Sequence, residues 1–127
     1  MHKATKLLPD QSYLRECFSY DPATGLLRWL DRPASHFASP HAYRGWTNRI
    51  GRLSDRTAGS LHHLGYINVQ LDKKLYPAHR IIFKLMTGRD ADTVDHKDGI
   101  GSNNVWDNLR DGTTLDNTRN RKVREGT

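Results

Sequence analysis

The stretch from Tyr66 to Gly88 constrains the fold of this chain more than any other part of its sequence. In Tyr66–Leu71 (YINVQL) apolar and polar residues alternate, and β-branched residues are frequent, which is typical of half-buried strands. Asp72-Lys73 then supplies a two-residue turn into a second short strand, Leu75–Pro77, and such turns suit the twist of paired strands. The sequence therefore predicts a β-hairpin here.

The segment PAHRIIFKLMTG follows the hairpin and has the period of a helix. Pro77 stands near its start and Gly88 is its stop, which are the usual positions of these residues at helix ends. The predicted apolar face comprises Ile81, Ile82, Leu85 and Met86.

Both ends of the chain add short elements. Asp10 can cap a helix over Gln11–Phe18, and the turn Asp21–Gly25 (DPATG) leads into a strand over Leu26–Leu30. Towards the C-terminus we expect the following elements: a strand Thr93–His96, a polar loop Gly99–Trp106, a strand around Leu109-Arg110, a turn at Asp111–Gly112 and a final helix Leu115–Arg124 capped by Thr113 or Thr114.

Periodicity disappears between residues 31 and 59, and we expect a long irregular segment there. It carries five arginines and three aromatic residues: Arg32, Arg44, Arg49, Arg52, Arg56, Phe37, Tyr43 and Trp46. One interpretation is a DNA-contacting arm, with arginines on phosphates and aromatics against sugar or base. The alternative is a solvated loop anchored by its own aromatics.

Composition limits the class of protein. The 127 residues suffice for one compact domain, and 35% hydrophobic residues predict long polar surface segments. One cysteine, Cys17, excludes an internal disulfide and a zinc cluster of paired cysteines. No apolar run reaches membrane-spanning length and no signal peptide is visible, so we expect a soluble, cytoplasmic protein without a membrane partner.

The net charge of +6 favours a polyanionic partner, although many small soluble proteins are basic. Residues 1–88 hold 13 Lys and Arg against 6 Asp and Glu, whereas residues 89–127 hold 7 against 8. The basic charge therefore lies upstream, while the last third mixes carboxylates, amides and arginines.

That last third contains a set of residues suited to phosphodiester hydrolysis. Asp95 and His96 end a predicted strand, and they can share one site if the strand ends or bends there, as the following KDG supports. Carboxylate and amide oxygens suit a hard ion such as Mg²⁺ or Mn²⁺. A neutral histidine beside the ion can take a proton from water.

These residues resemble the HNH motif of the ββα-metal nucleases, in the zinc-free form found in phage and group I intron homing endonucleases. Asp95-His96 matches its first element, Asn108-Leu109 its second and Asn117 its third. YPAHRIIFKLMTG resembles the block that precedes the motif, and the doublet Asn103-Asn104 matches as well. The resemblance covers roughly Gly65 to Arg121, about half of the chain.

The resemblance implies a role for each residue. His96 would be the general base, and Asp95 and Asn117 would bind one divalent ion, Mg²⁺ before Mn²⁺, with no structural zinc. Asn108 would fix His96 or its loop. Arg80 and Arg121, with Arg44, Arg49, Arg52 and Arg56, would bind double-stranded DNA.

Several alternatives to these roles stay open. Asp116 could replace Asn117 if the helix register differs by one, and His79 could be a core histidine. We expect Asn103 and Asn104 to satisfy backbone groups of their loop.

We therefore expect an α+β fold: a basic N-terminal extension (residues 1–60) and an HNH nuclease domain (residues 61–127) with a C-terminal ββα-metal unit. The predicted function is a metal-dependent DNA endonuclease, nicking or double-strand cutting, as a monomer or homodimer. The alternative is a non-catalytic DNA-binding module with the hairpin in the major groove. An RNA-binding role has only the charge to support it.

Overall fold

The computed structural model describes residues 7–53, 55–91 and 93–112, and these form the α+β fold that the sequence predicts. The helices are α1 (Gln11–Cys17), α2 (Pro40–Gly51) and α3 (Ala78–Thr87), with 3₁₀ turns η1 (Ala34–His36) and η2 (Trp106–Asn108). The strands are β1 (Phe18–Asp21), β2 (Leu26–Trp29), β3 (Ser60–Leu61), β4 (Ile67–Leu71), β5 (Lys74–Pro77), β6 (Thr93–His96) and β7 (Leu109–Gly112).

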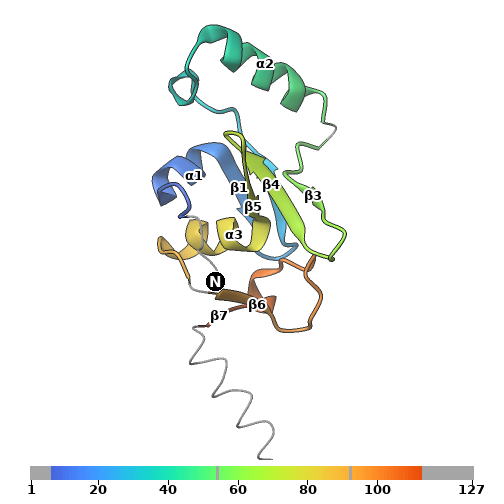
Figure 1. The fold of residues 1–127 in the computed structure, drawn as a ribbon. Helices are drawn as coiled ribbons and strands as arrows, with labels where there is room; N and C mark the ends of the chain where they lie inside the picture. Colours follow the sequence, from blue (N-terminus) through green and yellow to red (C-terminus); the bar gives the residue numbers. More distant parts are fainter. Residues whose placement is uncertain (1–6, 54, 92, 113–127) are drawn as a thin grey trace, which may run out of the picture.

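The strands form three small antiparallel sheets, β1–β2, β3–β4–β5 and β6–β7. A bridge between Arg28 and Thr57 and a hydrogen bond from the Ala58 N–H to the Leu27 carbonyl join β2 to the segment before β3. The first two sheets occupy the middle of the molecule with α1 and α3 beside them, whereas α2 lies at one end and β6–β7 at the other (Figure 1).

The predicted hairpin and helix are confirmed. Asp72 and Lys73 have φ of 51° and 70°, the left-handed values that a tight turn between β4 and β5 requires. Helix α3 ends at Thr87, and its C-cap residue Gly88 has φ of 84° and an N–H that donates to the Lys84 carbonyl at 2.8 Å. Met86 is 40% exposed, so its predicted place on the buried face is wrong. It lies about 140° around the helix from Ile81, at the edge of that face.

One apolar core joins the elements. Its most deeply buried side chains come from α1, β4 and α3: Leu14, Cys17, Val69, Leu71, Ile81 and Ile82. Each fully buried aliphatic side chain of this size contributes about 1.5–3 kcal/mol. Side chains from both sides of residue 60 contribute to this core, and the division of the chain there stays a prediction.

Helix α2 corrects the expectation of an irregular segment between residues 31 and 59. Ser39 caps it by accepting a hydrogen bond from the Ala42 N–H at 3.1 Å, and Pro40 occupies its first turn. Trp46 and Ile50 are its buried residues. Two glycines and a run of arginines interrupt the apolar period, so the pattern alone misses the helix, although the Ser-Pro pair signals its start.

Two smaller differences follow from strand pairing. Helix α1 ends at Cys17, and Phe18 begins strand β1, which pairs with β2 and was not predicted. Asp111 and Gly112 pair with β6 as part of β7 instead of forming a turn. The predicted helix Leu115–Arg124 lies outside the described residues. Among the residues that are described, no helix has the length and apolar character needed to cross a membrane.

Candidate functional site

The Asp95-His96 pair stands where the sequence predicts it, at the end of a strand. Strand β6 pairs with β7 so that Asp95 lies opposite Arg110 and His96 opposite Leu109. The chain then turns, and the Gly99 N–H donates to the His96 carbonyl at 2.9 Å. Gly99 has φ of 76°, a backbone conformation that glycine adopts without steric cost.

His96 contacts two side chains from other elements. Its Nε2 lies 2.8 Å from Oδ1 of Asn104, a residue that is only 3% exposed. Its ring meets the ring of His79 on α3 edge to face, with centroids 4.8 Å apart. The Asn104 side chain was expected to hydrogen-bond to the backbone of its loop, and this expectation is wrong because it contacts His96 instead. The sequence does not show which amide of the loop reaches His96, since that depends on the loop's folded conformation.

His79 is a partly buried, neutral histidine. Burial lowers the pKa of His79 to about 4, and the positive charges of His96 and Arg80 add to the shift. Its Nδ1 is buried and has no hydrogen-bond partner within the described part of the chain. A neutral ring at this position packs against His96 without placing a charge beside it.

Asn108 closes the loop that follows His96. Its Nδ2 donates to Oδ1 of Asp98 at 2.9 Å and to the Asn103 carbonyl at 2.8 Å. Its Oδ1 accepts from the Asp98 N–H at 3.1 Å. Hydrogen bonds from Asn103 and from the Ile100 N–H hold the pKa of Asp98 below its usual range. Asn108 thus makes loop-fixing contacts of the predicted kind, and its part in catalysis stays a prediction.

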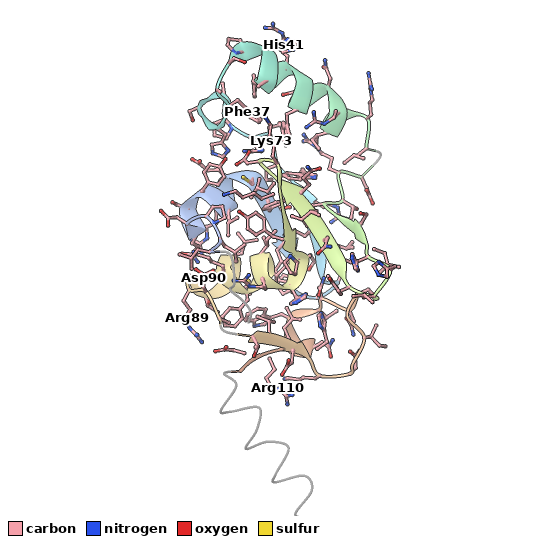
Figure 2. The ribbon with its side chains drawn as sticks, viewed as in Figure 1. Phe37, His41, Lys73, Arg89, Asp90 and Arg110 are labelled. Carbon is pink, nitrogen blue, oxygen red and sulfur yellow. The ribbon has the colours of Figure 1, made fainter. Side chains whose placement is uncertain are left out.

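Asp95 is half-exposed and has one charged neighbour. Its Oδ2 lies 3.6 Å from a guanidinium nitrogen of Arg110, and the two side chains are 37% and 38% exposed. Figure 2 shows Arg110 at the β6–β7 end of the molecule. Arg110 was not singled out from the sequence, although antiparallel pairing of the two predicted strands places it opposite Asp95.

Residues 76–119 match a family model described as HNH endonuclease. This segment of the chain is therefore similar to HNH endonucleases. The matched segment contains His79, Asp95, His96, Asn108 and Asn117, and the resemblance noted from the sequence is confirmed.

A solved structure described as "DNA binding and cleavage by the HNH homing endonuclease I-HmuI" is similar in fold, with a TM-score of 0.53 and 22% sequence identity over 87% of this chain. The chain spans 55% of that chain's length. No curated protein sequence matches this one significantly.

Helix α2 lies outside the HNH motif and presents cations to solvent. Arg44, Arg49 and the C-cap residue Arg52 are exposed. At about 100° per residue these three fall on one side of the helix, and Trp46 and Ile50 fall on the other. His41, near the start of α2, lies at the tip of the molecule opposite the HNH motif (Figure 2).

Arg32 departs from the predicted DNA-contacting role. It is 2% exposed, and its Nη2 donates to Asp72 Oδ1 at 2.9 Å and to the Tyr13 hydroxyl at 2.7 Å. Its guanidinium lies 4.5 Å from the Phe37 ring and 5.2 Å from the Trp46 ring. This arginine therefore attaches the α2 region to the core, and Trp46 is an anchor instead of a surface for sugar or base.

The remaining predicted DNA-binding residues differ in exposure. The side chain of Arg80 is 13% exposed and 3.6 Å from Asp90, and that of Arg56 is 34% exposed and 2.8 Å from Asp31. A phosphate contact from either stays a prediction. Asn117 and Arg121 lie outside the described residues.

Proposed function

We propose that this chain is a DNA endonuclease that hydrolyses phosphodiester bonds with His96 as general base and one divalent ion. The observation that carries the proposal is the strand-end Asp95-His96 pair, inside the matched HNH segment, followed by a loop that Asn108 holds in place. A fixed loop keeps the imidazole in one position, which general-base catalysis requires. Such a base contributes roughly 10²–10⁴-fold to the rate.

His96 would take a proton from a water molecule, and the resulting hydroxide would attack the scissile phosphorus. The bond from phosphorus to the 3′ oxygen would then break. Two neutral groups, His79 and Asn104, surround the imidazole. Neither of these two groups places a charge against the imidazole at neutral pH.

The donor set fits a hard divalent ion. Asp95 offers a half-exposed carboxylate beside His96, and Asn117 would supply a second oxygen. The described residues contain no cluster of three or more His, Cys, Asp or Glu able to hold a metal, so the second ligand has to come from an amide, from a residue outside them or from the substrate. A bound ion would supply positive charge to the phosphate and to the leaving oxygen.

Helix α2 would hold the DNA at a distance from the site of cleavage. Its exposed arginines suit phosphate contacts, which carry most of the sequence-independent affinity for a duplex. Because α2 and β6–β7 lie at opposite ends of the molecule (Figure 1), a duplex touching both would run along its length. Arg56, Arg80 and Arg121 would add further phosphate contacts.

Conversion of supercoiled plasmid tests the proposal, with Mg²⁺, with EDTA, and with the variants His96→Ala and Asn117→Ala. We expect relaxed or linear product that requires the metal and disappears with His96→Ala. The matched control is His63→Ala, an exposed histidine of the β3–β4 turn, which should cleave like the wild type.

Two outcomes would redirect the proposal. Binding of plasmid without cleavage, across several divalent ions and sequences, would favour the non-catalytic DNA-binding module. Cleavage that survives His96→Ala would mean that another residue is the base. The ratio of relaxed to linear product separates nicking from double-strand cutting.

A further inference from the structure

The Asn104 side chain is the hydrogen-bond partner of one of the two ring nitrogens of His96. Asn104 Oδ1 lies 2.8 Å from His96 Nε2. An amide oxygen only accepts hydrogen bonds, so this contact is satisfied when Nε2 carries the proton. The lone pair of the neutral ring then lies on Nδ1.

The N-terminal hairpin β1–β2 contacts the backbone of Asn104. The Tyr20 hydroxyl donates to the Asn104 carbonyl at 2.5 Å, across 84 positions of sequence. The N–H of Trp106 donates to the Pro22 carbonyl at 3.0 Å. Burial, followed by the negative charges of Asp21 and Asp107, raises the pKa of Tyr20 to about 12, so its hydroxyl stays a donor at neutral pH.

Gly25 brings the hairpin turn into direct contact with this loop. Its φ is 80°, and a Cβ built there would lie 2.5 Å from the Asn104 carbonyl carbon and from the Val105 nitrogen. Any side chain would therefore displace the backbone that carries Asn104. The turn and the loop are therefore packed directly against each other.

We propose that Asn104 is a positioning residue that fixes His96 as its Nε2–H tautomer, leaving Nδ1 as the base, and that the β1–β2 hairpin holds Asn104 in place through Tyr20 and Gly25. This inference rests on the proposed function for its catalytic meaning. It gives the hairpin, which lies outside the matched HNH segment, a part in the active site. Neutral imidazole otherwise divides between two tautomers, and only one presents its lone pair to the water.

The tautomer can be read without any cleavage assay, by long-range ¹H–¹⁵N correlation of the His96 ring at about pH 8.5, where imidazole is neutral. We expect the Nε2–H pattern in the wild type. Asn104→Leu keeps much of the side-chain volume but removes the acceptor, so the two tautomers should become mixed. Asn104→Asp keeps an oxygen acceptor and should restore the Nε2–H pattern.

Cleavage kinetics give the second readout. We expect Asn104→Leu to lower kcat by about 10–100-fold with little change in KM, because loss of an orienting partner alters the reacting group more than the DNA contacts. Asn104→Asp should recover most of this loss, which a purely structural role would not predict. Tyr20→Phe should produce a smaller loss, roughly 3–10-fold, since it loosens the support and leaves the acceptor in place.

Tyr13→Phe is the control for Tyr20→Phe. It removes a hydroxyl that also makes long-range hydrogen bonds, to Asp72 and from Arg32, but in the network that anchors α2. It should leave the His96 tautomer unchanged. Gly25→Ala should mix the tautomers as Asn104→Leu does, through the displaced loop.

The outcomes separate the two proposals. An Nδ1–H pattern in the wild type would overturn the assignment directly, even if Asn104→Leu failed to fold. If the wild type cleaves DNA and Asn104→Leu changes neither the His96 tautomer nor kcat, the positioning role is overturned. The proposed nuclease function would then remain. An Nε2–H ring that depends on Asn104, in a protein that cuts no DNA, would support the positioning and remove the proposed function.

Discussion

Polar groups attach both helix α2 and the β6–β7 hairpin to the core, but the main polar group is a charged side chain at α2 and an uncharged amide at the hairpin. A charged arginine, Arg32, is buried between aromatic rings and paired with Asp72 to anchor α2. Uncharged amides hold the loop after His96: Asn108 spans it and Asn104 meets the imidazole. One end of the molecule is therefore anchored by a buried cation, and at the other end amide side chains bind Asp98, the backbone and the imidazole.

This difference matches the task that the proposed function gives to each end. In the part of the chain that the structure describes, Arg44, Arg49 and Arg52 form no ion pair, so their charges remain available to a polyanion. Long-range attraction of this kind needs charge and tolerates flexible side chains. Proton transfer needs atoms at defined positions, and amides fix them without adding charge next to the base.

The largest expected effect comes from the anchor of α2. Arg32→Met should lower the free energy of unfolding by about 2–4 kcal/mol, because a buried network of hydrogen bonds and ring contacts loses its centre. Denaturant titration measures this loss. Arg44→Met, on the exposed face of α2, is the matched control and should change stability by at most about 0.5 kcal/mol. If both variants lost the same free energy of unfolding, the buried contacts of Arg32 would not contribute to stability.

Loosening the other end should affect the rate of the proposed reaction instead. Asn108→Ala removes three side-chain hydrogen bonds of the loop and should lower kcat about 100-fold, equal to about 2.7 kcal/mol of transition-state stabilisation. Its affinity for DNA should stay near that of the wild type. Asn68→Ala in β4 serves as the control, and a similar drop in that variant would argue against a specific role for Asn108.

Neutralising the charged end should give the reverse pattern. We expect the triple change Arg44→Ala, Arg49→Ala and Arg52→Ala to make the salt dependence of DNA binding weaker. The slope of the logarithm of the binding constant against the logarithm of the salt concentration should become less negative by about 2–3. The affinity itself should fall roughly 10-fold at low salt, with kcat at saturating DNA unchanged. Fluorescence anisotropy against salt concentration measures both quantities.

Lys73 and Lys74 at the tip of the β4–β5 hairpin provide the comparison for this triple variant. If their replacement by alanine cost more affinity than the α2 changes, the hairpin would be the main DNA-contacting element. That result would revive the arrangement with the hairpin in the major groove.

The smallest effect concerns pH and the neutral surroundings of His96. Because the pKa of His79 is lowered to about 4 in the folded chain, its stabilising contribution is complete above the ordinary value of 6.5 and is lost as pH falls towards 4. We expect this loss to reach about 1 kcal/mol at about pH 5.8 and to grow below it. His79→Leu should unfold with a weaker dependence on pH between 7 and about 5, whereas His63→Leu should keep the wild-type dependence. Thermal unfolding across this range distinguishes them.

Local patterns identified much of the fold in advance. The β4–β5 hairpin and α3 follow from alternation, a turn and a helix stop within about 25 residues, and β6 ends at His96 because a turn sequence follows it. The order of Asp95, His96 and Asn108 is likewise readable without the fold. Helix α2 was missed because its apolar residues are few, and only the folded chain shows that Trp46 and Ile50 are buried in the core.

The sequence by itself determined the HNH motif, the hairpin and helix before it, and the unequal distribution of charge. Only the tertiary structure decided which arginine is buried, which amide meets His96 and which turn supports that amide. Arg32 and Arg44 look alike in the sequence, but Asp72 and two aromatic rings enclose only Arg32. Periodicity records the pattern along one element, whereas a buried polar group is defined by partners that the folded chain brings from 40 or 84 positions away.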